Sequence, residues 1–482
     1  MGSHHSHEGK GSSEQGGGSG LSTPRAGSQR GAGSRSGSGG DLQGLPEKQD
    51  KPLPSMVPIE KLGKLLAQRS QKEDGVNGIT EKSFTQYVFP MYPELAAQFY
   101  RHVHRAGRCR ARHVPLAAFR QQCERILGLL DDAVIIETYV KMFSSDEDEN
   151  TVTPDCLRKL LYTSYKLSMD HHPDGPQTCP MIEQTLSAVV NGCFNNKDSH
   201  SVGFVVRWLE EHCRRLVFPV HRYCVHTLAT RHRAPAGGAA GGAAGAAGAA
   251  RGSPLLPVSA GWLLAGAAPA PYARAGAAPP AAPAGRAWLA RLLCAAPSHW
   301  QPLYASRDHG AGANRFLHHT LAYRGPTVVL VRGGGVVLAA CAGAEWRESH
   351  AYWGPADCAL LQLQPTFCTV ERGPKLLYLN LSIRGYPRGL RVGSDPRLPA
   401  LDISQDFDKF TFQGSPYSLD DIEVWGCGDT ASRETQLEIK KWQVREAERQ
   451  RCVKLSAADW MEHPDRYLLE LAGRPQYNNS AS

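Results

Sequence analysis

Apolar residues recur at the helical period between residues 56 and 232. In "TPDCLRKLLYTSYKL", Leu157 and Leu160 belong to an apolar stripe, with Thr153 before it and Pro154 at its start. Threonine favours the N-cap position and proline the first helical position. The segments "DDAVIIETYVKMF" and "GFVVRWLEEHCRRL" carry similar stripes. Such stripes are typical of helices that bury one face, so we predict an all-α region over 56–232.

The period changes between residues 286 and 428. In "KLLYLNLSIRG", Leu377 and Leu379 alternate with Tyr378 and Asn380, as expected for a half-buried strand. "PTVVLVRGGGVVLAACAG" contains two apolar runs around a glycine turn, which predicts a hairpin buried on both faces. "IEVW" predicts another strand. The fold class is therefore α+β.

Two stretches have low complexity. Residues 1–55 are rich in glycine and serine, and such composition predicts a flexible leader. Residues 233–285 are rich in alanine and glycine and are interpreted as a linker or an insertion. From 429 to 482 the chain becomes helical and charged again. The predicted domains are thus the leader, a helical domain over 56–232, the linker, a β-rich domain over 286–428, and a C-terminal helix with a tail.

Composition and charge argue against several classes of function and location. The net charge of +8 is modest for 482 residues and is spread thinly, so nucleic acid is not an expected partner. No apolar run is long enough to span a membrane, and no apolar segment near the start resembles a secretory signal. The chain is expected in the cytosol, where its 13 scattered cysteines would stay reduced.

The first ten residues, "MGSHHSHEGK", contain a lipidation pattern. Gly2 follows the initiator methionine and Ser6 lies four residues later, as an N-myristoyltransferase requires. The interrupted histidines do not form an unbroken purification tag. A leader without lipid is the alternative. We predict Gly2 as the lipidation site.

Three segments of the helical region resemble EF-hand loops: "KEDGVNGITEKS", "SDEDENTVTPDC" and "NNKDSHSVGFVV". Tight calcium binding needs a bidentate glutamate at the twelfth loop position. That position holds Ser83, Cys156 and Val206 respectively. We therefore predict an EF-hand-like domain with degenerate loops and no metal site.

Candidate catalytic sets are weak. The pairs His171–His172 and His318–His319, and the neighbouring Asp170, lack the i, i+4 spacing of helical metal ligands. Glu345 directly precedes Trp346 and Glu423 lies two residues before Trp425, an environment that can favour acid–base chemistry but more often holds a structural carboxylate. We predict no catalytic residue and no cofactor, and keep Glu345 and Glu423 as candidate partner-binding residues.

The β-rich region contains four distinctive blocks: "WQPLYASRDHGAGANRFLHHTLAYRGPTVVLVR", "VVLAACAGAEWRESHAYWGPADCALLQL", "PKLLYLNLSIRGYPRGLRVG" and the closing "FDKFTFQGSPYSLDDIEVWGCG". Taken in order, these blocks cover about residues 290–428 and resemble the TLDc domain family. The resemblance implies a β-sandwich flanked by helices, without established catalysis.

The order of the predicted domains points to one branch of this family. A Gly2 lipidation pattern, EF-hand-like helices, a TLDc domain and a charged C-terminal helix are together similar to the mTOR-associated TLDc branch, and in part to fungal myristoylated TLDc proteins. That similarity implies a non-enzymatic adaptor on the cytosolic face of lysosomal membranes. Its expected partners are subunits of the vacuolar-type proton pump (V-ATPase) and components of the mTOR complex. The alternatives are an oxidative-stress resistance protein and a calcium-responsive sensor.

The C-terminal segment from Arg433 to Arg451 contains no proline or glycine and is dominated by strong helix formers. Leu437 and Val444 lie on one face, with Trp442 near its edge. The remaining faces alternate in charge, which stabilises a helix without tertiary support. We predict a partner-binding helix with Leu437, Trp442 and Val444 as anchors; a helix packed across the β-sandwich is the alternative.

Overall fold

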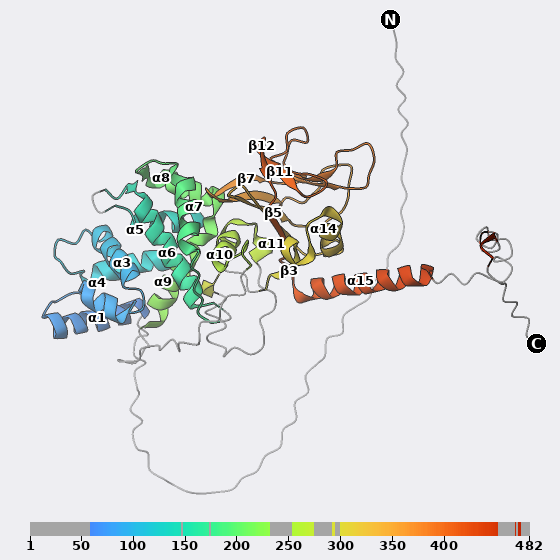
Figure 1. Ribbon diagram of the computed structural model, residues 1–482. Helices are drawn as coiled ribbons and strands as arrows, with labels where there is room; N and C mark the ends of the chain where they lie inside the picture. The colour runs from blue at the N-terminus through green and yellow to red at the C-terminus, as the bar shows by residue number, and fades with distance from the viewer. Residues whose placement is uncertain are drawn as a thin grey trace, which may run out of the picture. The chain divides into compact units, whose positions relative to one another are not determined.

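The structure is a computed structural model that describes residues 58–145, 148–172, 175–231, 253–273, 292–294, 299–451, 468 and 471–473 (Figure 1). A helical region comes first, antiparallel sheets follow, and a long helix comes last. This order confirms the predicted α+β class. Within the described ranges, no helix combines the length and apolar character needed to cross a bilayer. Gly2 and the rest of the leader lie outside these ranges.

The helical region consists of short amphipathic helices with polar N-caps. Side-chain oxygens of Thr80, Asp131, Thr153 and Ser201 accept hydrogen bonds from backbone N–H groups in the first turns of their helices. Thr153 and Pro154 hold the cap and first-turn positions that the sequence predicts. The helices are α1 (Pro58–Asp74), α2 (Glu81–Tyr87), α3 (Pro93–Ala106), α4 (Leu116–Leu127), α5 (Asp132–Met142), α6 (Pro154–Asp170), α7 (Ile182–Phe194), α8 (Val202–His212), the 3₁₀ helix η1 (Arg214–Leu216) and α9 (Phe218–Thr230).

Two pairs of loops in this region are joined as in EF-hands. Ile79 and Val114 exchange backbone hydrogen bonds of 2.9 Å, which join the α1–α2 and α3–α4 loops. Strand β1 (Thr151–Val152) pairs in the same antiparallel manner with β2 (His200–Ser201). The structure thus contains four such loops, one more than the sequence predicts. The additional loop precedes Pro115 and is rich in arginine, so it carries no acidic signature.

The strand pairing corrects one loop assignment. Val152 pairs with His200, and Ser201 caps helix α8. His200 therefore takes the strand position of its loop, and Phe204, not Val206, takes the twelfth position. This correction leaves the chemistry unchanged, since neither side chain can supply a carboxylate to calcium.

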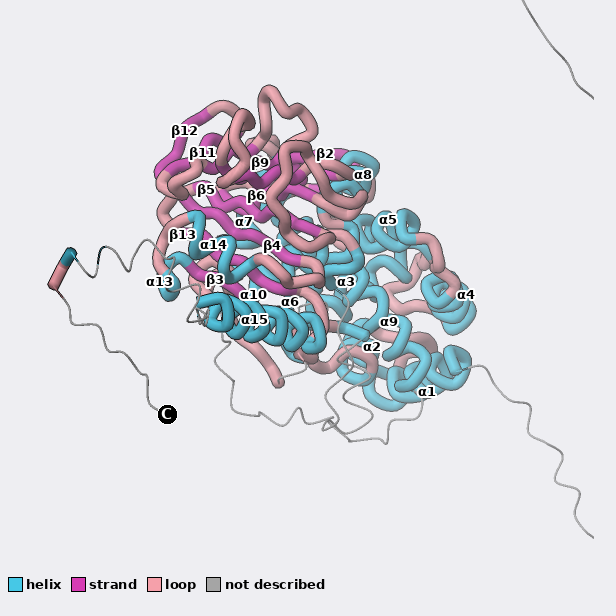
Figure 2. Tube along the Cα trace, turned by 90° about the vertical axis from the view of Figure 1, so that its right-hand side faces the viewer, coloured by secondary structure: helices cyan, strands magenta, loops and turns pink. Residues whose placement is uncertain are grey.

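The β-rich region consists of two antiparallel sheets (Figure 2). The six-stranded sheet has the order β3-β13-β4-β5-β6-β7, and the five-stranded sheet has the order β12-β11-β10-β9-β8. Two short helices, α13 (Ser306–His309) and α14 (Ala313–Thr320), follow the first strand. The strands are β3 (Gln301–Ala305), β4 (Thr327–Gly333), β5 (Val336–Ala342), β6 (Ala359–Gln364), β7 (Cys368–Arg372), β8 (Leu377–Asn380), β9 (Gly389–Val392), β10 (Leu401–Ile403), β11 (Lys409–Phe412), β12 (Ser415–Ser418) and β13 (Asp421–Gly426).

The six-stranded sheet is buried on both faces. Along β4, Val329 and Val331 belong to the core shared with the second sheet, whereas Val328 and Leu330 belong to the core shared with the helical region. This arrangement accounts for the continuous apolar runs of the predicted β4–β5 hairpin. The tight turn of that hairpin places Gly334 at a positive φ of 57°, which glycine adopts without strain.

Strand β8 differs from its prediction. All four of its residues are buried, including Tyr378 and Asn380 on the face predicted to meet water. The following loop covers that face: the Tyr378 hydroxyl donates to the carbonyl of Pro387, and the Asn380 amide donates to those of Ile383 and Pro387. The alternation describes the strand correctly, but a polar loop replaces solvent as the partner of its second face.

Part of the predicted linker is a buried helix. Helix α10 (Val258–Ala267) is followed by the short α11 (Ala270–Ala273), and its Trp262, Leu263 and Leu264 are almost completely buried. The core around α10 includes residues of both the helical region and the six-stranded sheet. Because the surrounding sequence is rich in alanine and glycine, it predicts a linker rather than a buried helix at this position. The neighbouring predicted linker residues 233–252 and 274–285 lie outside the described ranges.

Helix α7 meets the β6–β7 turn at close range. The backbone N–H of Phe367 donates to the carbonyl of Ala188 at 2.8 Å, and the Phe367 ring is fully buried near Trp208. A side chain at Gly192 would collide with the Phe367 carbonyl, because a Cβ atom there would lie 2.1 Å from its oxygen. The helical region and the sheet are thus joined through backbone contact as well as through a common core.

Candidate functional site

The last helix, α15 (Thr430–Arg451), begins beside the six-stranded sheet (Figure 2). The carboxylate of Asp429 accepts hydrogen bonds from the backbone N–H and hydroxyl of Ser432, so Asp429 caps the helix. Just before it, the backbone N–H of Gly428 donates to the hydroxyl of Tyr323 at 2.9 Å. The start of the helix is therefore fixed by its sequence and by contact with the segment before β4.

Gln436 holds the first half of α15. Its side chain is completely buried, and its Nε2 donates to the carbonyls of His319 and Leu321 at 3.0 and 2.9 Å. Arg433 donates to the Gln436 side-chain oxygen from one turn earlier. These bonds satisfy carbonyls at the C-terminal end of α14, which would otherwise lack helical partners. The helix is therefore docked through polar contacts rather than an apolar face.

From Leu437 onward, α15 presents apolar side chains to solvent. Trp442 is 61% exposed, Val444 55% and Leu437 42%. Almost every described residue after Lys440 in this helix is exposed. Large apolar side chains gathered on one exposed helix are typical of a binding surface. The residues predicted as anchors are thus all accessible, although their partner-binding role stays a prediction.

Glu345 lies on a different surface, in the segment after β5. Its carboxylate is 3.7 Å from the Nε of Arg324, and both side chains are largely exposed. It also lines an open cavity of about 480 Å³ together with Arg347, Trp353 and Lys375. Its accessibility is compatible with partner binding, but the structure does not bring it together with the α15 residues.

Glu423 is a structural carboxylate. It is only 2% exposed, and it accepts hydrogen bonds from the Trp425 indole at 2.9 Å and from the Ser253 hydroxyl. The guanidinium of Arg307 lies 3.6 Å away and is closer to Asp421, at 2.7 Å. Because these internal groups surround it, Glu423 has no surface to offer a partner, and we remove it from the candidate set.

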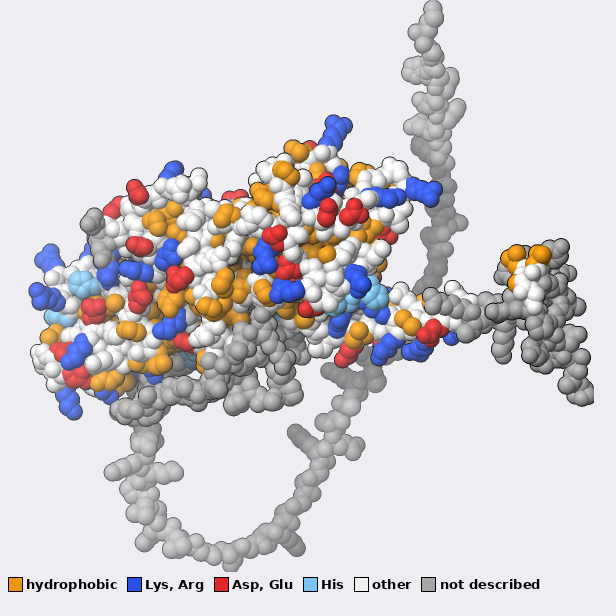
Figure 3. Space-filling model, in the orientation of Figure 1, with side chains coloured by type: hydrophobic (Ala, Val, Ile, Leu, Met, Phe, Trp, Pro, Cys, Tyr) orange, Lys and Arg blue, Asp and Glu red, His pale blue; other side chains and the backbone are white. Residues whose placement is uncertain are grey.

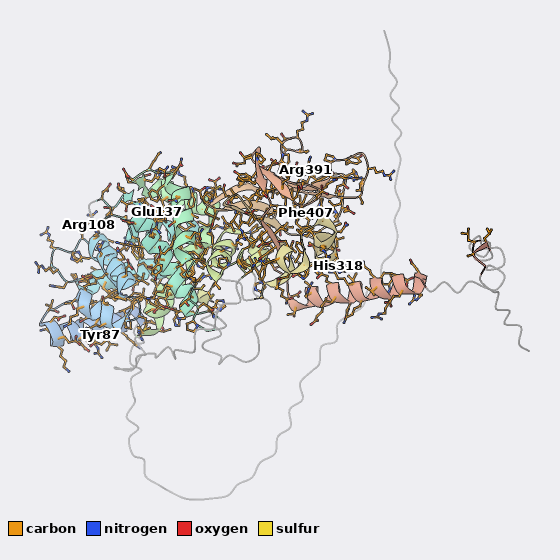
Figure 4. The ribbon with its side chains drawn as sticks, viewed as in Figure 1. Tyr87, Arg108, Glu137, His318, Arg391 and Phe407 are labelled. Atoms are coloured by element: carbon orange, nitrogen blue, oxygen red, sulfur yellow. The ribbon has the colours of Figure 1, made fainter. Side chains whose placement is uncertain are left out.

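Among the residues that the structure describes, neither histidine pair belongs to a group of three or more side chains that could hold a metal ion. Asp170 accepts from the Tyr92 hydroxyl at 2.8 Å, and the Nδ1 of His171 lies 2.9 Å from the Leu167 carbonyl. His318 lies at the end of α14, next to α15 (Figure 4).

Burial raises the pKa of several cysteines among the described residues. Burial raises the pKa of Cys341 to about 12, and it also raises the pKa of the partly exposed Cys109 and Cys368. A raised pKa reduces the fraction of the nucleophilic thiolate. These thiols are therefore poorly suited to react with peroxides.

Sequence reasoning missed the polar face through which Gln436 docks α15. Arg433, Gln436 and Lys440 follow each other at spacings of three and four, so they share one helical face. The alternating charges instead predict a helix that is stable without tertiary support. The regular spacing of the polar face was the available signal, but the partner carbonyls at His319 and Leu321 carry no trace in the sequence.

Comparisons with known proteins agree with this architecture. Residues 288–428 match the TLDc domain family. MTOR-associated protein MEAK7 of Danio rerio is 27% identical over 161 residues, which are 30% of this chain and 36% of that protein. Restriction of telomere capping protein 5 of Leptosphaeria maculans is 23% identical over 252 residues, covering 36% of this chain and 40% of the relative.

A second telomere capping protein 5, from Colletotrichum graminicola, is 42% identical, but over only 74 residues. Each match therefore covers less than half of the relative. The family match coincides with the two antiparallel sheets, ending between β13 and α15. Residues 288–428 of this chain form a TLDc domain.

Proposed function

We propose that this protein is a non-enzymatic, membrane-tethered adaptor that binds the vacuolar-type proton pump on the cytosolic face of lysosomal membranes. The TLDc domain and the similarity to an mTOR-associated relative support a regulatory role linked to mTOR signalling. The observation that carries the proposal is the set of exposed apolar side chains on α15. A helix of this kind can place Leu437, Trp442 and Val444 in a groove on its partner.

The decisive experiment is binding of purified full-length protein to purified pump in detergent. Ending the chain after Lys440 removes Trp442, Val444 and the C-terminal tail, and keeps Leu437 and the Gln436 contacts. We expect this variant to keep its fold and to bind the pump at least tenfold more weakly. Equal binding by the two proteins would mean that another surface carries the contact.

Membrane attachment is proposed to require two signals. A single myristoyl chain at Gly2 gives marginal binding, so the pump itself would supply the second. Gly2→Ala should move most of the protein from the membrane to the soluble fraction of cells, and pump binding in detergent should be unchanged. Full membrane retention of this variant would refute the lipid proposal and leave the pump proposal standing.

The sensor alternative receives no support from the loops. Their twelfth positions hold Ser83, Ala118, Cys156 and Phe204, and none is a carboxylate. Calorimetry of the full chain with calcium should show no micromolar binding. A micromolar isotherm that is lost in Asp148→Ala would favour the sensor. The oxidative-stress alternative has no reactive thiol among the cysteines whose pKa burial raises.

A further inference from the structure

Five basic side chains converge where α15 crosses the end of α14. We call them the basic cluster: His309, His318, His319, Arg433 and Lys440. The ring centroids of His309 and His319 are 4.0 Å apart, and those of His318 and His319 are 5.1 Å apart. Histidine, lysine and arginine side chains gather at this junction in the space-filling view (Figure 3). The two cationic residues of α15 face these imidazoles from the same helical side as Gln436.

Within the part of the chain that the structure describes, no carboxylate forms an ion pair with the basic cluster. Among the described residues, Lys440 makes no ion pair or hydrogen bond, although it is half-buried. Burial and, secondarily, Arg433 lower the pKa of its ammonium group to about 8. Glu438, two residues away, projects from another side of the helix. A half-buried cation without a counter-charge is unfavourable, so the site favours an added anion.

His319 lies within the same group of positive charges. Its pKa is lowered to about 4 by burial and then by His309, Lys440, His318 and Arg433. The Tyr304 ring, 6.0 Å from it, is the remaining titratable neighbour from β3. His319 is therefore mostly neutral near pH 7 when no anion is bound.

We infer that the basic cluster binds a dianionic phosphate monoester, presented by a phosphorylated segment of a partner protein. Imidazole, guanidinium and ammonium groups together supply several N–H donors, which suit the three acceptor oxygens of a phosphate monoester. A lipid headgroup is less suitable, because α15 is only weakly cationic: its six Lys and Arg residues are interspersed with four Glu residues, unlike the polybasic clusters that attract anionic bilayers. This inference does not depend on the proposed pump interaction.

Anion binding at this site is linked to protons. A bound dianion favours the charged forms of Lys440 and His319, so it raises the pKa of both groups. Binding therefore takes up protons, and affinity increases as the pH falls. Sulfate stays doubly charged between pH 6 and pH 8, so a change in its affinity reports protonation of the protein alone.

The test is titration of the full-length protein with the peptide Ala-Ala-phosphoserine-Ala-Ala, with inorganic phosphate and with sulfate. Binding is measured by calorimetry and by the NMR resonances of the histidine rings. We expect saturable binding by all three anions. Sulfate affinity should increase at least threefold from pH 8 to pH 6. Lys440→Gln should weaken peptide binding at least tenfold, and Lys441→Gln, its exposed neighbour, should change it less than twofold.

Several results would overturn the inference. Equal losses of peptide affinity in Lys440→Gln and Lys441→Gln would indicate a diffuse electrostatic attraction rather than a site. Anion binding that does not saturate would also show that no specific site exists. Binding to phosphatidylcholine vesicles containing a phosphoinositide, without binding to the peptide, would assign the phosphate to a lipid instead. The exposed His318 provides a second variant, His318→Gln, that is not expected to affect folding and should weaken peptide binding two- to fivefold.

Discussion

Two helical contacts with the TLDc domain differ in kind. Helices α7 and α10 share an apolar core with the six-stranded sheet, and the backbone of α7 bonds directly to Phe367. Helix α15, in contrast, is held by the polar side chain of Gln436, and its second half is exposed. Loss of the first contact exposes a core, whereas loss of the second exposes two carbonyls. The difference shows which helix can exchange partners without unfolding the domain.

Phe367→Ala should have the largest effect on this comparison. The ring is fully buried where the β6–β7 turn meets the helical region, and its removal leaves a cavity. We expect the free energy of unfolding to fall by about 3–5 kcal/mol. Chemical denaturation monitored by circular dichroism would measure it. A loss below about 1 kcal/mol would mean that the contact is peripheral to stability.

Trp442→Ala should produce the opposite pattern. The side chain is 61% exposed and supports no part of the fold, so stability should change by less than about 0.5 kcal/mol. Pump binding should weaken by about 2 kcal/mol if Trp442 is a hot spot. Gln443→Ala, on the adjacent exposed residue, is the matched control and should bind normally. A large stability loss in Trp442→Ala would contradict the separation of the two roles.

Gln436→Ala should release α15 without disturbing the sheets. The substitution removes two hydrogen bonds to the carbonyls of His319 and Leu321, with an expected local cost of about 1–2 kcal/mol. Hydrogen exchange should accelerate in α15 and stay unchanged in β4 and β13. Thr435→Ala, one residue earlier, serves as the control. Global acceleration would show that the helix contributes to the core after all.

Acid should weaken the contact of α8 with the sheet, with the smallest effect of the four. The His212 Nδ1 accepts from the backbone N–H of Thr369 at 3.0 Å, and burial lowers the His212 pKa. A lowered histidine pKa means that the unfolded chain binds the proton better. This stabilisation is present above about pH 6.5 and is lost as the pH falls toward the folded-state pKa.

The variant His212→Asn retains an acceptor oxygen that does not titrate near neutral pH. Thermal unfolding of this variant should therefore depend less on pH between 7 and 5 than that of the unsubstituted protein. An unchanged slope would mean that other buried histidines, such as His221, account for the acid sensitivity.

The sequence predicts elements whose signals are local. The β4–β5 hairpin follows from two apolar runs around glycines, and the start of α6 follows from Thr153 and Pro154. Helix α15 follows from its helix-forming residues. Its exposed Leu437, Trp442 and Val444 also agree with the narrow stripe seen in the sequence.

What the sequence does not predict depends on distant partners. The second face of β8 is covered by a loop, and α10 is buried although its composition resembles a linker. The loop ending at Val114 retains its backbone bridge without acidic residues, because pairing uses main-chain groups alone. The docking of Gln436 uses carbonyls, which every residue possesses, so residue types cannot reveal it.

The position of α10 has a consequence for how the chain can be divided. This helix is held by contacts with both neighbours, including hydrogen bonds from Arg215 and Arg372 to the carbonyls of Ala268 and Ala267. A polypeptide cut between residues 232 and 252 would separate the helical region from a second fragment that begins with α10. The apolar side chains of α10 would then form a specific binding surface for the helical fragment. We therefore expect the two co-expressed fragments to associate and restore the fold.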